Sequence, residues 1–168
     1  IRSLYFDTPS DRALREKLDG VSRREKFRIR YYNGDTSVIH LEKKSKLGGL
    51  GNKQSAPLSV PETSALLQGG LSWMTGSGRP LVRELYSKLR TQQLRPRTIV
   101  EYTREPYICP AGNVRVTLDY DIRIGLSCED FLTPGITIPA GDTPIILEVK
   151  WDSFLPSVVR DAIQLEGR

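Results

Sequence analysis

Basic side chains recur at every second position of one short segment of this chain. Lys26, Arg28 and Arg30 alternate with the apolar Phe27 and Ile29. In a β-strand, successive side chains point to opposite faces, so the three cations would share one face of a sheet. Like charges this close repel one another unless an anion lies among them. Because guanidinium groups bind phosphate oxygens through paired hydrogen bonds, the segment predicts a phosphate-binding face.

The same alternation of charged and apolar positions recurs in four later segments. A sheet with one hydrated face would explain the alternation alone, but the density of cations and the amphipathic helices favour a closed barrel with the charges inside. Lys43 falls on the opposite face from Lys44 and therefore outside such a lumen. The charged or polar positions that share a face are His40, Glu42, Lys44 and Lys46 in residues 37–46, Tyr102 and Arg104 in 97–108, Arg115, Thr117, Asp119 and Asp121 in 113–124, and Glu148 and Lys150 in 144–151.

Carboxylates inside a basic lumen have two uses. One is to hold a divalent cation that bridges phosphate oxygens. The other is to pair with an arginine, which we expect of Asp119 and Asp121 because a lumen this basic offers any carboxylate a cationic partner. Phosphoryl transfer needs little beyond positioning and charge stabilisation, so the lack of an obvious nucleophile is no objection to it.

The segments that position these side chains are mainly strands. Asn33-Gly34 predicts a tight hairpin between two of them. Helices are predicted over residues 10–18, 61–68 and 80–94 and after Pro156, while 47–59, 72–78 and 131–141 are predicted as loops. Trp151, on the apolar face of the last strand, is expected in the core. Strands are predicted over residues 2–7, 26–32, 37–46, 97–108, 113–124 and 144–151.

Length and charge limit the class of protein. The 168 residues carry 25 Lys and Arg against 20 Asp and Glu, and they predict one globular domain. The charge is uneven, because residues 1–60 hold 13 basic and 7 acidic side chains and residues 111–168 hold 5 and 9. No apolar run reaches the roughly 18–20 residues that span a bilayer. No secretion signal is seen, and Cys109 and Cys128 lack metal-site spacing, so we expect free thiols in the cytoplasm.

An ordered set of motifs resembles a known family. YFDTP, KFRIRYY, HLEKKSK, EYTR, VRVTLDYD and LEVKW are similar, in this order, to motifs of the VTC domain. This domain is the polyphosphate polymerase branch of the triphosphate tunnel metalloenzyme superfamily, which is related to the CYTH proteins. The resemblance implies an α+β fold, a closed antiparallel β-barrel forming a triphosphate tunnel with helices packed outside. It also implies metal-dependent transfer of the ATP γ-phosphate to a growing polyphosphate chain.

The resemblance also assigns roles to positions of this sequence. The chain is expected to form one tunnel domain over residues 1–168 that lacks the family's first strand and its C-terminal basic motif. A divalent cation, Mn²⁺ or Mg²⁺, is expected as cofactor. The implied catalytic residues are Arg28, Arg30, Lys44, Arg104 and Arg115, the substrate-binding residues are Lys26, Lys53, Tyr102 and Lys150, and the metal ligands are Glu148 and Glu42.

Other functions would use the same lumen. A triphosphate hydrolase and a non-catalytic module that binds polyphosphate or inositol phosphate both remain alternatives to the polymerase. An RNA-binding module is disfavoured, because few aromatic residues lie among the inward arginines. The expected partners are therefore ATP and inorganic polyphosphate or triphosphate, with an inositol phosphate as a candidate regulator, and neither nucleic acid nor a membrane-spanning segment is expected.

Overall fold

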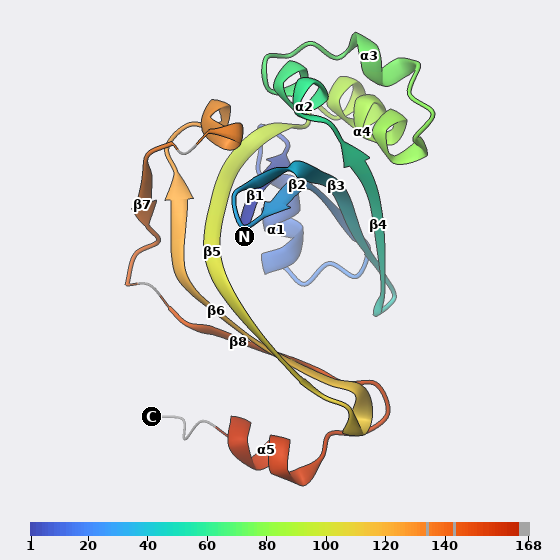
Figure 1. The fold of residues 1–168 in the computed structure, drawn as a ribbon. Helices are drawn as coiled ribbons and strands as arrows, with labels where there is room; N and C mark the ends of the chain where they lie inside the picture. Colours follow the sequence, from blue (N-terminus) through green and yellow to red (C-terminus); the bar gives the residue numbers. More distant parts are fainter. Residues whose placement is uncertain (134, 143, 165–168) are drawn as a thin grey trace.

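The computed structural model describes residues 1–133, 135–142 and 144–164 of the chain (Figure 1). An antiparallel sheet forms its centre, with the strand order β4-β3-β2-β1-β5-β6-β7, and β8 also pairs with β6. The strands are β1 (Arg2–Asp7), β2 (Arg24–Tyr32), β3 (Asp35–Leu47), β4 (Leu50–Leu58), β5 (Arg95–Cys109), β6 (Val114–Gly125), β7 (Thr137–Pro139) and β8 (Ile146–Lys150). The helices are α1 (Arg12–Leu18), α2 (Val60–Leu67), α3 (Ser72–Thr75), α4 (Pro80–Thr91) and α5 (Ser157–Ile163), with short 3₁₀ turns η1 (Ala111–Asn113) and η2 (Cys128–Leu132).

The sheet is curled but open, so the prediction of a closed barrel is wrong. Within the described part of the chain, β4 pairs with β3 alone, and β7 and β8 pair with β6 alone. Figure 1 shows β5 and β6 sweeping round one side of a concave space and β4 bounding the other. Closure requires pairing between edge strands at a matching stagger. The alternation of charged and apolar residues specifies the two faces of a sheet and says nothing about that pairing.

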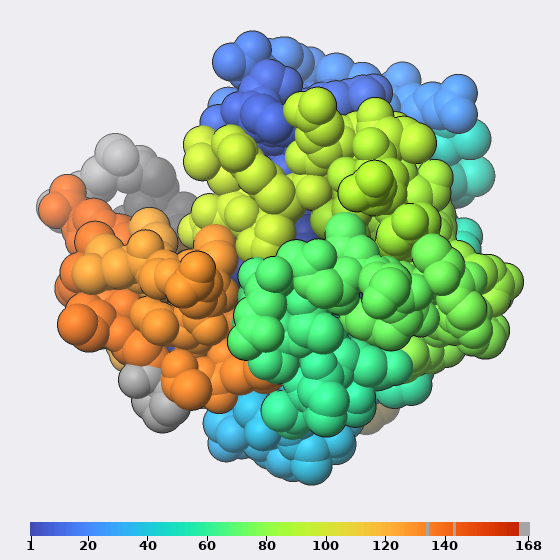
Figure 2. Space-filling model, turned by 90° about the horizontal axis from the view of Figure 1, so that it is seen from above, coloured from blue at the N-terminus to red at the C-terminus, as the bar shows by residue number. Residues whose placement is uncertain are grey.

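The hydrophobic core lies on the convex face of the sheet. Leu4, Ile29 and Leu41 are fully buried there against α2, α3, α4 and η2. Figure 2, viewed from above, shows α2 and α3 in green beside α4 in yellow-green. The prediction that amphipathic helices cover the apolar face is therefore confirmed for this part of the sheet. Trp151 directly follows β8, outside this core, and is 50% exposed, so its predicted core position is wrong.

A strand replaces the loop predicted over residues 47–59. Gly48 and Gly49 have φ angles of 56° and 88°, and they close a two-residue turn between the paired Leu47 and Leu50. Such a turn needs positive φ at both central residues, which glycine adopts without strain. The prediction failed because β4 is an edge strand whose polar, mostly exposed residues show little alternation.

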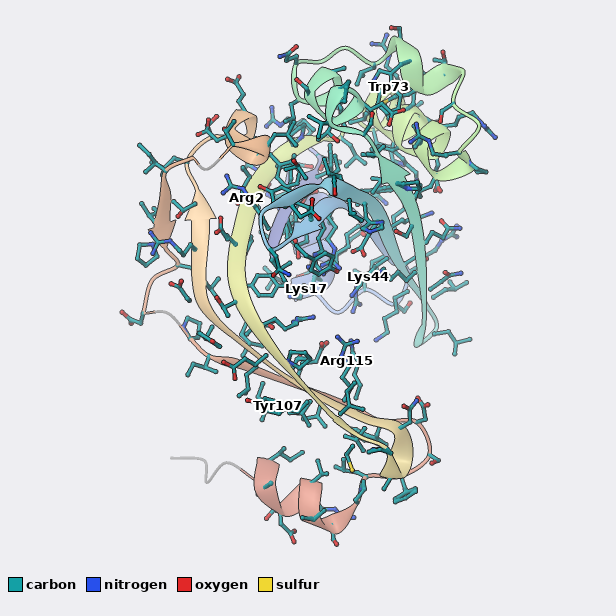
Figure 3. The ribbon with its side chains drawn as sticks, viewed as in Figure 1. Arg2, Lys17, Lys44, Trp73, Tyr107 and Arg115 are labelled. Atoms are coloured by element: carbon teal, nitrogen blue, oxygen red, sulfur yellow. The ribbon has the colours of Figure 1, made fainter. Side chains whose placement is uncertain are left out.

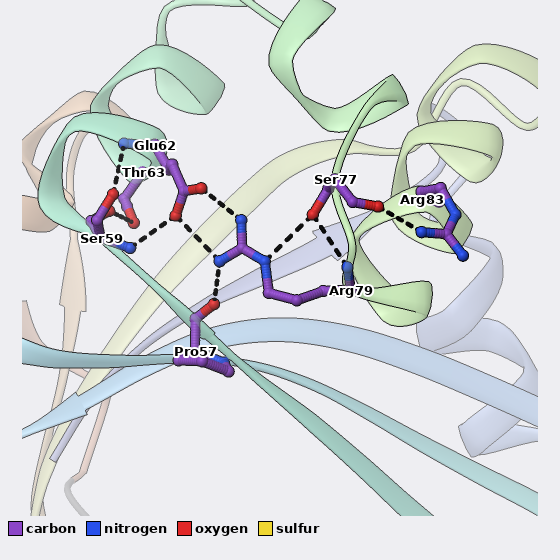
Figure 4. Close-up of polar contacts among 7 residues, drawn as sticks. All are labelled: Pro57, Ser59, Glu62, Thr63, Ser77, Arg79 and Arg83. Carbon is purple, nitrogen blue, oxygen red and sulfur yellow. Dashed lines mark hydrogen bonds and ion pairs between the residues drawn. The ribbon is translucent and has the colours of Figure 1, made fainter.

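Arg79 ties the helical layer to the end of β4 (Figure 4). Its guanidinium donates to the backbone oxygen of Pro57 at 2.5 Å and forms an ion pair with Glu62 in α2. The Arg79 Nε also donates to Ser77 Oγ at 3.2 Å, just before α4 begins. Ser59 and Glu62 form a capping box at the start of α2. One side chain therefore joins a strand and the starts of two helices.

Arg79→Ala should destabilise the fold without touching the concave face. The substitution removes one ion pair and leaves the Pro57 carbonyl without its guanidinium donor, so we expect a loss of about 1–3 kcal/mol of unfolding free energy. Urea denaturation followed by circular dichroism measures it. Arg90→Ala, at an exposed position of the same helix, is the matched control and should change stability by less than about 0.5 kcal/mol. Equal stability of the two variants would contradict the role given to Arg79.

Candidate functional site

The concave face of the sheet carries the predicted charged side chains. The paired positions of neighbouring strands point to the same side, so the registers place these residues on one surface. Figure 3 shows Lys17, Lys44 and Arg115 directed into the concave space. The basic residues are Lys26, Arg28 and Arg30 of β2, Lys44 of β3, Lys53 of β4, Arg104 of β5, Arg115 of β6 and Lys150 of β8, and the carboxylates are Glu42, Asp119 and Glu148.

Glu42 is the more deeply buried of the two buried carboxylates on this face, the other being Asp119. Its side chain is 3% exposed, and Arg28 Nε donates to its Oε2 at 2.7 Å. Lys53 Nζ lies 2.5 Å from the other carboxylate oxygen. Burial by itself would raise the pKa of Glu42, but Lys53 and Arg28 outweigh it and lower that pKa from 4.5 to about 2. Glu42 is therefore ionised at neutral pH and already holds two of the predicted phosphate-binding cations.

Arg30 is held by neutral oxygens rather than by a carboxylate. Its Nε donates to Ser3 Oγ at 2.8 Å and its Nη2 donates to Tyr102 Oη at 2.9 Å. Tyr102 is only 9% exposed, and burial raises the pKa of its hydroxyl. Because both partners of Arg30 are uncharged, the full positive charge of its guanidinium is uncompensated by them. The structure thus gives Tyr102 a contact with Arg30, while its predicted contact with substrate stays a prediction.

Arg104 and Asp119 form a bidentate pair across β5 and β6. Arg104 Nε and Nη2 each lie 2.6 Å from an oxygen of Asp119. The expectation of pairing with an arginine of the basic face is confirmed for Asp119. It is not met by Asp121, which is 60% exposed and lies 3.9 Å from Arg123, a residue outside this set. Lys43 is also confirmed on the opposite face, where it pairs with Glu25 of β2 and Glu84 of α4.

The curl brings the edge strand β8 towards β3. Lys44 and Lys150 both line a cleft of about 510 Å³ that also contains Lys26 and Lys53. Burial, together with the nearby positive charges of Arg28 and Lys150, lowers the pKa of Lys44 from 10.5 to about 8. Cations from strands that are not hydrogen-bonded to each other therefore act on one another across the concave space.

Arg115 and Glu148 lie at the more open end of the face. Arg115 is exposed and is paired in register with Lys150, and Figure 3 shows it further towards α5 than Lys44. Glu148 is 44% exposed and lies 3.2 Å from Lys150 Nζ. Over the described residues, no group of three or more His, Cys, Asp or Glu side chains could hold a metal ion.

Sequence reasoning missed several polar residues of this face. Ser3 and Tyr5 alternate with the buried Leu4 and Phe6, so the alternation along β1 could have identified them. Arg28 Nη1 donates to Tyr5 Oη at 3.2 Å. Lys17 lines the same cleft as Lys44, but it comes from α1, and no strand pattern could have placed it there.

Arg28→Ala should cost far more stability than Arg30→Ala. Removing Arg28 leaves the buried Glu42 carboxylate with one cation fewer, and we expect a loss of about 3 kcal/mol of unfolding free energy. The double variant Arg28→Ala/Glu42→Ala should recover most of that loss, because no uncompensated charge stays buried. Arg30→Ala removes bonds to neutral hydroxyls only and serves as the control in the same thermal and urea denaturation series. If Arg28→Ala is as stable as the unsubstituted protein, the compensation described for Glu42 is wrong.

No curated protein matches the chain. A family model described as VTC domain matches residues 1–168, which is the entire chain. The protein therefore belongs to the VTC domain family, whose members have the tunnel-metalloenzyme-like fold.

Proposed function

We propose that this chain is a metal-dependent polyphosphate polymerase that transfers the γ-phosphate of ATP to a growing polyphosphate chain. Family membership indicates a polyphosphate-related function in general. The observation that carries the finer proposal is the concave face itself, where eight basic residues from six strands outnumber three carboxylates. Such an excess of positive charge attracts and concentrates polyanions.

The residues of β2 suit a linear chain of phosphoryl groups. Lys26, Arg28 and Arg30 stand in a row that spans about 13 Å at the usual rise of a strand. In this proposal, Arg28 and Arg30 bind successive phosphates, and Lys44 and Arg104 neutralise the negative charge of those phosphates from either side of β2. Lys26, Lys53 and Lys150 extend the binding row, and Arg115 contacts the more exposed end of the chain. Positioning and charge stabilisation of this kind account for most of phosphoryl-transfer catalysis.

The carboxylates of this face suit a metal ion that arrives with its phosphates. Glu148 is partly exposed, whereas both oxygens of Glu42 already face cations. Mg²⁺ and similar ions are held by one or two carboxylates together with substrate phosphates and water. In this proposal Glu148 is the protein ligand, and Mn²⁺ or Mg²⁺ would stabilise charge on the transferred phosphoryl group. The predicted role of Glu42 in metal binding has less support, because a metal would have to displace Arg28 and Lys53.

Location and partners belong to the same proposal. Cys109 and Cys128 are free thiols, which supports the expected cytoplasmic location. No helix in the described ranges is long and apolar enough to cross a membrane. The proposed partners are ATP and inorganic polyphosphate or triphosphate, and an inositol phosphate stays a candidate regulator.

Products formed from ATP and MnCl₂ test the proposal directly. We expect acid-resistant phosphate chains, resolved by gel electrophoresis, and their loss on chelation of the metal. Arg30→Ala should reduce the rate by at least about 100-fold, since it removes one fixed donor to the transferred charge. Lys43→Ala, on the opposite face of the sheet, is the control and should keep the rate. Free phosphate as sole product would establish the hydrolase instead, and binding without turnover would establish the sensor.

Lys44 should take up a proton when triphosphate binds. Its pKa of about 8 lies below the ordinary 10.5 because neighbouring cations and burial disfavour the charged form, and a bound polyanion reverses that preference. At pH 8 about half of the free protein carries an uncharged Lys44, so binding should take up to about half a proton from the buffer. Calorimetric titrations in buffers of different ionisation enthalpy measure this uptake. Lys44→Met should abolish it and Lys43→Met should not, and equal uptake in both variants would rule out Lys44 as the proton acceptor.

A further inference from the structure

A pocket lined by apolar and charged side chains lies beside one end of the cationic row. Its volume is about 590 Å³, within the range of small-molecule sites. The walls come from β1, α1 and β5, which contribute Tyr5, Leu14 and Val100. Ala13 lies on the same side of α1 and also lines the pocket. We call this space the α1 pocket.

The α1 pocket is continuous with the proposed phosphate-binding row. Ala13, Lys17 and Lys26 line both this pocket and the cleft that contains Lys44. The Tyr5 ring lies between the two regions, with Lys26 Nζ 5.6 Å from its centroid and its hydroxyl accepting from Arg28. A ligand with an apolar group in the pocket would therefore hold its anionic part along β2.

Helix α1 has no buried residue of its own, so polar contacts and not apolar packing hold it beside this pocket. Asp7 accepts hydrogen bonds from the backbone N–H groups of Ala13 at 2.8 Å and Leu14 at 3.1 Å. Asp11 forms a bidentate pair with Arg97 at the start of β5. These contacts hold Leu14 opposite β5, although its side chain is 53% exposed. An apolar side chain held in an unfilled pocket gains contact area when a ligand enters.

We propose that the α1 pocket binds the nucleoside of the nucleoside triphosphate whose phosphates lie along β2. This inference rests on the proposed function, because the triphosphate is what places the base. A nucleoside is the class of group that combines a flat, largely apolar base with a direct link to a triphosphate. Lys26 then stands where the base-bearing end of the triphosphate begins, and Arg28 and Arg30 follow it towards the terminal phosphate.

Binding of ATP and of inorganic tripolyphosphate, measured by calorimetry in the same buffer, separates the pocket from the phosphate row. In the variant Leu14→Ala/Val100→Ala we expect the Kd for ATP to rise about tenfold, because apolar contact with the base is lost. The Kd for tripolyphosphate, which has no base, should stay within about twofold. Thr98→Phe, at a residue that lines this pocket but not the cleft of Lys44, fills the same space by the opposite change and should weaken binding of ATP alone. The two variants test the pocket independently, so a folding defect in one leaves the other decisive.

Leu18→Ala is the matched control, because Leu18 lies in α1, is 74% exposed and does not line the pocket. It should leave both affinities unchanged. Unchanged ATP affinity in both pocket variants, or an equal loss for ATP and tripolyphosphate, would overturn the inference while leaving the proposed function standing. Failure of the unsubstituted protein to bind tripolyphosphate would instead remove the proposed function itself.

Discussion

The concave face depends on the burial of one carboxylate among several cations. Without Glu42, the guanidinium of Arg28 and the ammonium groups of Lys44 and Lys53 would repel one another in a half-buried setting. With it, two of these cations are partly compensated, and their side chains are held before any ligand arrives. Asp119 does the same for Arg104 on the other side of the face. The surplus of positive charge that remains is what a polyanion can neutralise.

Holding these cations in place before a ligand binds costs desolvation free energy and fixes their geometry. Buried ion pairs rarely add net stability, because the desolvation of both charges offsets their attraction. Their effect here is geometric, because they hold the cations in fixed positions, which the proposed phosphate binding requires. Arg30 shows another arrangement, in which neutral hydroxyls orient a guanidinium and leave its charge uncompensated.

The sequence predicted the two faces of the sheet better than its overall shape. A period of two in β2 placed Arg28 with Arg30 and buried Ile29 on the other side, and the structure agrees. Local sequence sets helices α2 and α4, because α2 begins with a capping box and α4 begins with a proline and has an apolar face. Strand β4 was missed because its residues show no alternation of apolar and polar positions. Barrel closure was mispredicted because it depends on contacts between edge strands that lie far apart in the chain. The positions of Lys17 and Lys150 relative to Lys44 likewise come from the curl and not from any local pattern.

A single alternation of side chains along β2 sets both faces of the strand. Phe27 and Ile29 fill the core at exposed fractions of 2% and 0%, while their immediate neighbours face the opposite side. Loss or gain of a single residue at the start of β2 would exchange the two sets, sending guanidinium groups into the helical layer and aromatic carbon into water. Residues of β2 can therefore be substituted one at a time, whereas an insertion or deletion would exchange its two faces. We expect homologous chains to keep the length of this strand.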